Sequence, residues 1–278
     1  MPLTLAAKLL YSTTRIRVFT ESGKVWSGTG FFVTLKPNPN EDIYFVFSNK
    51  HVLVADEKAT IEIAFHLDDG KHMPSNKNIK VKQEINEKLL IEHPDKDVDL
   101  CAYCIGPIIN NLAKDNIEVF LQSVETDLIP KDFSMFDAIE DIIMIGYPKG
   151  IADEVNNLPI VRRGITATPL SNDYCGEKIF AVDMACFPGS SGSPVYIYNN
   201  GNYIDPRLNA RIIGKTRLFL LGILSSGPDI KDRAIDKNNN VNNNILIRKE
   251  IHLGYVIKSE EILKLKAEIE KTLNIKLR

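Results

Sequence analysis

The stretch Gly189-Ser190-Ser191-Gly192-Ser193-Pro194 puts a serine into a small, tight loop. Glycine at positions 189 and 192 permits backbone angles that other residues avoid. Pro194 then starts an apolar run, Pro194–Tyr198, that predicts a strand. A loop of this kind can aim consecutive backbone N–H groups into one space, as a developing oxyanion requires. Clusters of glycine, serine and proline also form ordinary turns, so a catalytic role for Ser191 depends on partners elsewhere in the chain.

The first candidate partner is a histidine at the end of an apolar segment. His51 follows Phe45-Val46-Phe47-Ser48-Asn49 and precedes Val52-Leu53, so we expect it on a short helical turn after a strand. A serine hydroxyl is a weak nucleophile and needs an adjacent base that titrates near neutral pH. The other histidines lie in strand-like runs or polar turns: His66, His72, His93 and His252. The context therefore favours His51 as a general base.

The second candidate partner is a carboxylate at the start of an apolar strand. Asp99 directly precedes Leu100-Cys101-Ala102-Tyr103. In that position a carboxylate can be partly buried while it accepts a histidine N–H, which fixes the tautomer of the imidazole. Asp95 and Asp97 lie farther from the apolar run, and we interpret them as acids of a solvated turn.

Six motifs follow one another along the chain: Gly28-Thr29-Gly30-Phe31-Phe32-Val33, Ser48-Asn49-Lys50-His51-Val52, Asp97-Val98-Asp99-Leu100, Ile145-Gly146-Tyr147-Pro148-Lys149-Gly150, Gly189–Pro194 and Gly222-Ile223-Leu224-Ser225-Ser226-Gly227. Taken in this order, they resemble the trypsin-like serine peptidases, and most of all the disulfide-free bacterial branch related to the HtrA/DegP proteases. The resemblance covers roughly residues 13–257. An α/β-hydrolase would instead place its serine before the acid and the histidine.

The resemblance implies a catalytic triad and an oxyanion hole. Ser191 would attack a peptide carbonyl, His51 would take its proton, and Asp99 would orient His51. The backbone N–H groups of Gly189 and Ser191 would stabilise the oxyanion.

It also implies where substrate binds. The substrate backbone would pair with the edge Ser225-Ser226-Gly227. Ala185 and Cys186 would form the base of the primary pocket, with no acid to pair with lysine or arginine of a substrate. We therefore expect apolar or small side chains before the cleaved bond.

Two positions depart from the family pattern. Secreted relatives carry an aspartate before the nucleophile, which captures a newly cleaved N-terminus, whereas this chain has Ser190. Activation by N-terminal cleavage is therefore not expected, and the oxyanion loop must be ordered by another route, either constitutively or by a partner. Ser193 replaces the usual glycine two residues after the nucleophile.

Strand-like runs separated by turn residues dominate the chain and predict an all-β fold. We expect two six-stranded antiparallel barrels followed by a C-terminal helix, because closure removes exposed sheet edges. The expected parts are a first barrel with His51 and Asp99 over 1–112, a connection over 113–140, a second barrel with Ser191 over 141–257, and the helix over 258–278.

The C-terminal helix is expected over residues 259–274, with Ser259 as its N-cap. An apolar stripe at helical spacing, made of Ile262, Leu265, Ile269 and Leu273, predicts packing on the second barrel. A helix that binds a partner is the alternative. Two other segments are a short helix or strand over 1–11 and an asparagine-rich loop tip over 238–244.

The composition of the chain argues against two classes of binding partner, nucleic acids and membranes. The 278 residues are 44% hydrophobic and 25% charged, with a formal net charge of −2, so no field attracts nucleic acid or an anionic membrane. No apolar run approaches the roughly 20 residues that span a bilayer, and residues 1–11 lack the features of a signal peptide. We expect neither a nucleic acid nor a membrane as partner.

The four cysteines show no disulfide framework. On a strand, Cys101 and Cys104 would point to opposite faces, and no second pair of metal ligands follows. Free thiols suit a reducing, cytoplasmic setting, and we expect no metal and no cofactor. A redox or zinc protein built on the cysteines is the least favoured interpretation.

These observations predict an intracellular serine endopeptidase that acts on a protein or peptide substrate. The alternative is a protease-like binding module, or a latent protease, whose oxyanion loop stays collapsed until an activating protein partner binds.

Overall fold

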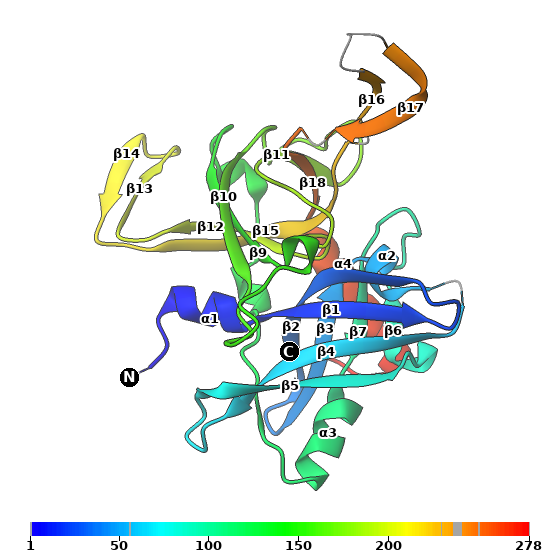
Figure 1. The fold of residues 1–278 in the computed structure, drawn as a ribbon. Coiled ribbons are helices and arrows are strands. Elements are labelled where there is room, and N and C mark those ends of the chain that lie inside the picture. Colours follow the sequence, from blue (N-terminus) through cyan, green and yellow to red (C-terminus); the bar gives the residue numbers. More distant parts are fainter. Residues whose placement is uncertain (1, 56, 229, 236–240, 250, 278) are drawn as a thin grey trace.

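Two antiparallel β-structures, one from each half of the chain, pack against each other (Figure 1). The computed structural model describes residues 2–55, 57–228, 230–235, 241–249 and 251–277. For residues 231–235 and 241–249 it describes the backbone alone. The expected all-β architecture with a C-terminal helix is confirmed.

The N-terminal half is an eight-stranded sheet that runs β5-β4-β1-β2-β3-β7-β6, with β8 paired to β4. The sheet has two more strands than the six expected. One of them, β8, lies in the segment 113–140 that was expected to connect the halves. The elements are α1 Leu5–Tyr11, β1 Thr13–Thr20, β2 Val25–Asn38, β3 Glu41–Ser48, α2 Lys50–Leu53, β4 Ala59–Asp68, β5 Pro74–Glu84, η1 Glu87–Leu89, β6 Leu90–Glu92, β7 Cys101–Cys104, α3 Gly106–Lys114 and β8 Val119–Phe120.

The C-terminal half is a closed barrel of six strands in the order β10-β11-β18-β15-β12-β9. Two hairpins, β13–β14 and β16–β17, project from it (Figure 1). The elements are η2 Thr126–Leu128, η3 Phe133–Met135, β9 Asp141–Gly146, η4 Pro148–Gly150, β10 Ile160–Thr166, β11 Ile179–Asp183, β12 Pro194–Asn199, β13 Asn202–Asp205, β14 Ala210–Ile213, β15 Arg217–Ser226, β16 Ile230–Ile235, β17 Val241–Lys249, β18 Leu253–Lys258 and α4 Glu260–Leu273.

Each half has its own apolar core, and a third core lies where the halves meet. The first sheet buries residues such as Ile16, Ile61 and Phe65, and the barrel buries residues such as Phe180 and Leu221. The shared core joins apolar side chains of both halves, including Phe31, Phe47, Leu100, Ile145, Tyr196 and Ile257. Burial of apolar surface at this junction stabilises the placement of one half on the other.

The helix α4 packs at the junction and not on the barrel alone, as the sequence had suggested. Its buried residues Ile262, Leu265 and Ile269 belong to the shared core, and the helix contacts both β6 and β18. Ser259 occupies the N-cap position but its side chain makes no capping hydrogen bond. Its backbone angles are helical, whereas a capping side chain acts from an extended backbone.

A buried contact between a histidine and a glutamate links α4 to the loop that carries Asp99. His93 Nε2 lies 3.2 Å from Glu261 Oε2, and both side chains are almost fully buried. His93 Nδ1 accepts a hydrogen bond from the backbone N–H of Asp95, so the proton of a neutral imidazole lies on Nε2, facing Glu261.

Some local expectations need correction. The strand β2 continues through Pro37 to Asn38, although a proline cannot donate a ladder hydrogen bond. Its pairing with β3 is irregular between Leu35 and Asn38. Of the asparagine-rich segment 238–244, residues 238–240 lie outside the described part, and 241–244 belong to β17. Among the described residues, no helix is both long and apolar enough to cross a bilayer.

Two leucines of α4 test its packing. Leu265 is fully buried, whereas Leu273, which the sequence placed on the same stripe, is 38% exposed. Leu265→Ala should lower the free energy of unfolding by about 2–5 kcal/mol, since it leaves a cavity in the shared core. Leu273→Ala is the matched control and should change it by less than about 1 kcal/mol. Denaturant unfolding measures both, and equal effects would contradict this placement of the helix.

Candidate active site

The antiparallel pairing of β3 and β7 brings His51 and Asp99 together. Ser48 at the end of β3 is opposite Cys101 at the start of β7, so the residues just beyond each strand end become neighbours. His51 Nδ1 lies 2.6 Å from Asp99 Oδ2, and the backbone N–H of His51 donates to Oδ1 at 3.1 Å. Asn49 Nδ2 donates to the Asp99 carbonyl at 2.7 Å. These hydrogen bonds fix the orientations of the His51 and Asp99 side chains.

This contact defines the tautomer of His51. Burial acts to raise the pKa of the Asp99 carboxyl, but hydrogen bonds and charge from His51, with a hydrogen bond from Ser225, outweigh it and hold the pKa below its usual value. The carboxylate is therefore ionised near neutral pH and only accepts hydrogen bonds. The Nδ1 of His51 must carry the proton, which leaves Nε2 of the neutral imidazole available as a base.

Ser225 links this pair to Ser191. Its hydroxyl donates to Asp99 Oδ2 at 2.8 Å, and its carbonyl accepts from the Ser191 hydroxyl at 2.9 Å. The sequence predicted Ser225 only as a substrate-binding edge. Its contact with Asp99 spans 126 positions of the chain, and no local pattern signals such a contact.

Ser191 and His51 line one cavity of about 340 Å³, although Ser191 Oγ donates to Ser225 and not to His51. Rotation about the Cα–Cβ bond of Ser191 turns its hydroxyl towards His51. Hydrogen bonds between a nucleophile and its base are often long or poorly aligned before substrate binds. Of the expected substrate-binding residues, Cys186, Ser225, Ser226 and Gly227 line this cavity, whereas Ala185 does not.

The loop before Ser191 has a defined backbone geometry. Gly189 has φ +89°, and a Cβ there would lie 2.8 Å from the Tyr147 carbonyl, so only glycine fits. The Pro188 carbonyl accepts from the Lys149 N–H at 2.6 Å. In a trans peptide the C=O and the following N–H point in opposite directions, so the Gly189 N–H points away from Lys149. Within the described part of the chain, neither this N–H nor that of Ser191 donates to a protein acceptor.

Thr29 belongs to the motif Gly28–Val33, but no sequence pattern predicted its role in the site. It is fully buried on β2, and its Oγ1 donates to the Gly189 carbonyl at 3.0 Å while accepting from the Tyr147 N–H at 3.0 Å. Its backbone N–H donates to the Ser191 carbonyl at 2.8 Å. Thr29 does not line the cavity, and its hydrogen bonds order the loop from the first sheet.

Burial limits what two further side chains near the cavity, Ser190 and Cys186, can do. Ser190 is fully buried and its hydroxyl has no partner, which fits a loop that is not ordered by an ion pair at this position. Burial raises the pKa of the Cys186 thiol to about 12. That thiol is un-ionised at neutral pH and acts as a wall of the cavity, since a reactive cysteine needs its thiolate.

The sheet of the first half and the closed barrel of the second form a chymotrypsin-like architecture. The model of the trypsin-like peptidase domain matches residues 28–204, more than half of the chain. The chain therefore belongs to the trypsin-like peptidase family.

Solved structures show weaker likeness. The HtrA-type protease AlgW with tripeptide has a TM-score of 0.49 and 13% identity over 98% of this chain and 64% of its own, so this chain spans less than two thirds of it. Catalytically active tobacco etch virus protease complexed with product has a TM-score of 0.48 and 13% identity over 96% and 83%. Deg5 has 0.43 and 14% over 81% and 88%. A comparison with curated proteins found no match.

The lowered pKa of Asp99 predicts a pH-dependent stability. A carboxyl whose pKa is lower when folded stabilises the fold above its unfolded pKa, and this contribution is lost as the pH falls through the folded value. Asp99→Asn should therefore reduce the free energy of unfolding at neutral pH, and its difference from wild type should shrink below pH 3.8. Urea unfolding between pH 7 and pH 2.5 measures this. Exposed Asp97→Asn is the control, and a difference independent of pH would argue against the contact.

Proposed function

We propose that this chain is a serine endopeptidase in which Ser191 is the nucleophile, His51 the general base and Asp99 the residue that orients it. The single observation that carries the proposal is the hydrogen-bonded series from His51 through Asp99 and Ser225 to Ser191, which crosses between the two halves of the fold. We further propose an intracellular setting, which the four free cysteines support.

The proposed reaction begins with acyl transfer. Ser191 Oγ attacks the carbonyl carbon of the scissile peptide bond while His51 Nε2 accepts its proton, and Asp99 stabilises the resulting imidazolium. The oxyanion accepts hydrogen bonds from the N–H groups of Gly189 and Ser191, each worth roughly 3–4 kcal/mol to the transition state. The C–N bond then breaks, the leaving amine takes the proton from His51, and an ester on Ser191 remains.

Hydrolysis of the ester completes the cycle. His51 takes a proton from water, which attacks the acyl carbon, and the proton returns to Ser191 as the C–O bond breaks. The products are an amine and a carboxylic acid, and the enzyme is unchanged. Orientation of the 188–189 peptide supports an oxyanion hole already formed without a partner, because the Pro188 carbonyl is engaged by Lys149 on the far side.

An active-site probe tests the proposal. A fluorophosphonate should label wild type. Ser191→Ala should abolish labelling, because it removes the Oγ atom that would bond to the phosphorus of the probe. His51→Ala should slow labelling by on the order of 10⁴-fold or more. The measurement is the labelling rate, followed by mass spectrometry of the modified peptide.

The matched control is Ser190→Ala, which removes a buried hydroxyl without a partner from the same loop and should label normally. An unlabelled wild type would instead favour the latent or binding-module alternative, in which the hydrogen bond from Ser191 to Ser225 holds the hydroxyl away from His51.

The lining of the cavity predicts specificity. Its described walls include apolar side chains, among them Phe187, Leu224 and Leu253. None of the described lining residues is an aspartate or a glutamate. Cleavage should therefore follow apolar or small residues, preferred over lysine and arginine by about tenfold or more, since a buried unpaired cation is costly. Profiling with a peptide library measures this, and a dominant preference for arginine or lysine would refute it.

A further inference from the structure

The turn that holds the 188–189 peptide contains a residue in a strained backbone conformation. We call residues 147–154 the holding turn. Within it Lys149 has φ +52° and Gly150 has φ +70°, so two consecutive residues lie in the left-handed region. A lysine avoids this region for steric reasons. Two backbone hydrogen bonds within the turn, from the Gly150 and Ile151 N–H groups, offset part of this strain, and contacts from outside add to them. Together they keep the conformation in which the Lys149 N–H reaches the Pro188 carbonyl.

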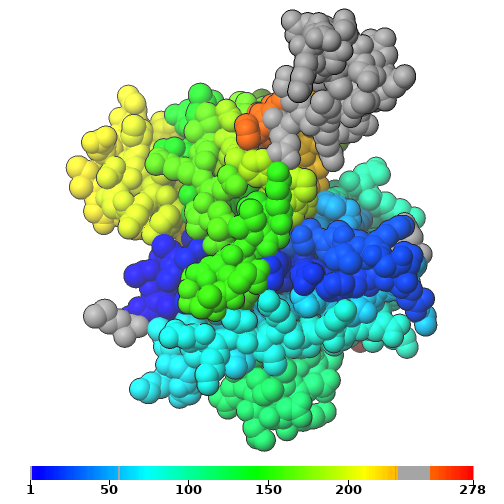
Figure 2. Space-filling view, in the orientation of Figure 1, coloured from blue at the N-terminus to red at the C-terminus, as the bar shows by residue number. Residues whose placement is uncertain are grey.

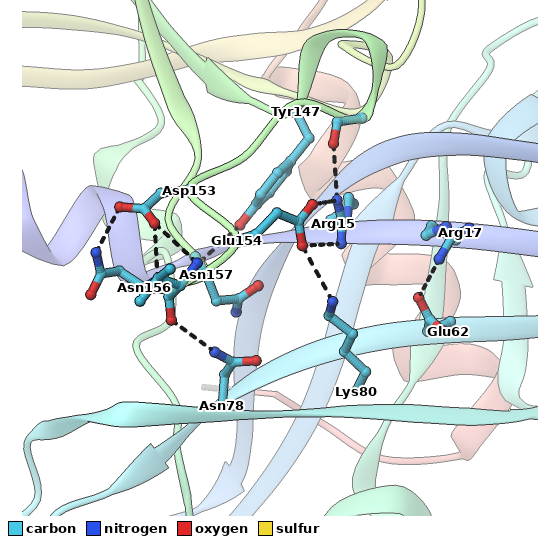
Figure 3. Close-up of polar contacts among 12 residues, drawn as sticks. Arg15, Arg17, Glu62, Asn78, Lys80, Tyr147, Asp153, Glu154, Asn156 and Asn157 are labelled. Atoms are coloured by element: carbon cyan, nitrogen blue, oxygen red, sulfur yellow. Dashed lines mark hydrogen bonds and ion pairs between the residues drawn. The ribbon is translucent and has the colours of Figure 1, made fainter.

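The strongest of these contacts comes from Arg15 on β1. Its Nη1 donates to the Gly150 carbonyl at 2.9 Å and to Glu154 Oε1 at 2.6 Å, and its Nη2 donates to Glu154 Oε2 at 3.3 Å (Figure 3). The Arg15 side chain is only 9% exposed, so its guanidinium is shielded from water, whereas Glu154 remains 58% exposed. The bonds to Glu154 are charge-assisted and involve both of its carboxylate oxygens. One guanidinium thus joins the middle and the end of the holding turn.

Weaker contacts lie around this one. Lys80 Nζ approaches Glu154 Oε2 at 3.3 Å, and the hydroxyl of buried Tyr147 donates to the Thr13 carbonyl at 3.3 Å. Figure 2 shows the green segment around residue 150 lying across the blue and cyan strands of the first sheet. The first sheet therefore supports the holding turn along its length.

We propose that Arg15 is a positioning residue for the oxyanion peptide. With Glu154 it fixes the holding turn, the turn fixes the Pro188 carbonyl through Lys149, and the Gly189 N–H is thereby aimed. This inference rests on the proposed function. It assigns to an internal arginine on the other half of the fold the ordering role that Ser190 cannot fill.

The expected consequence is specific to catalysis. Without Arg15 the turn relaxes, the Pro188 carbonyl loses its partner, and the 188–189 peptide is free to rotate. The transition state then loses one donor. Among the described residues, Arg15 does not line the cavity and has no hydrogen bond to the edge Ser225–Gly227. Within that described part, the holding turn reaches a cavity wall only through Lys149, whose Nζ lies 4.8 Å from the centre of the Phe187 ring. Substrate binding in the ground state should therefore change less than the rate of the chemical step.

Arg15→Met tests this against Arg17→Met. Arg17 lies two residues along the same strand and pairs with Glu62 at 3.2 Å, without a hydrogen bond to the holding turn (Figure 3). Arg15→Met should reduce kcat and the fluorophosphonate labelling rate on the order of 10–100-fold. KM should change less than about twofold. Arg17→Met should retain the wild-type rates.

Two further measurements separate positioning from folding. Glu154 is 58% exposed, so Glu154→Gln should fold normally and slow labelling severalfold, and combined with Arg15→Met it should add little. Guanidinium at low millimolar concentration should partly restore labelling of Arg15→Ala. A merely destabilised variant would not respond, since guanidinium weakens folding.

The outcomes are distinct. Labelled wild type with Arg15→Met and Glu154→Gln at the wild-type rate would overturn this inference and leave the proposed function intact. Equal losses in Arg15→Met and Arg17→Met would also overturn it. If Arg15→Met does not fold, normal labelling of Glu154→Gln together with no guanidinium rescue decides against it. An unlabelled wild type would overturn both proposals.

Discussion

One buried threonine joins the two halves of the molecule, and the geometry of the candidate site depends on it. Thr29 donates to the Ser191 and Gly189 carbonyls, accepts from the Tyr147 N–H, and its carbonyl accepts from the Ser48 hydroxyl. Two of these bonds reach the nucleophile loop, one reaches Tyr147 just after β9, and one reaches Ser48 at the end of β3. A buried polar group with all its partners satisfied gives a rigid arrangement, whereas a partly satisfied one is costly.

Glycine makes this close contact possible. A Cβ on Gly192 would lie 1.9 Å from the Thr29 carbonyl oxygen, and one on Gly146 would lie 1.9 Å from Ser193 Oγ. Neither distance is tolerated by any other residue. The glycines of the nucleophile loop therefore serve two purposes, since they allow the turn itself and also let the backbone of one half approach the other.

The ordering of the loop follows from contacts within the chain. Thr29 holds the Gly189 carbonyl, Lys149 holds the Pro188 carbonyl, and Ser190 contributes its N–H to the Phe187 carbonyl. Where an ion pair at position 190 would supply one strong interaction, several neutral hydrogen bonds and the Arg15 contact act together here. Such a distributed arrangement links the oxyanion peptide to the first sheet as well as to its own barrel.

The sequence by itself determined the features that depend on near neighbours. Apolar alternation located the strands, helical spacing located α4, and the ordered motifs around His51, Asp99 and Ser191 indicated the family. Only the tertiary structure decided how Ser225 and Thr29 serve the site, why Leu273 is exposed, where α4 packs, and that β8 joins the first sheet. These depend on strand register and on contacts between residues far apart in the chain. Local patterns carry no record of such contacts, because the same residues in another register would meet different neighbours.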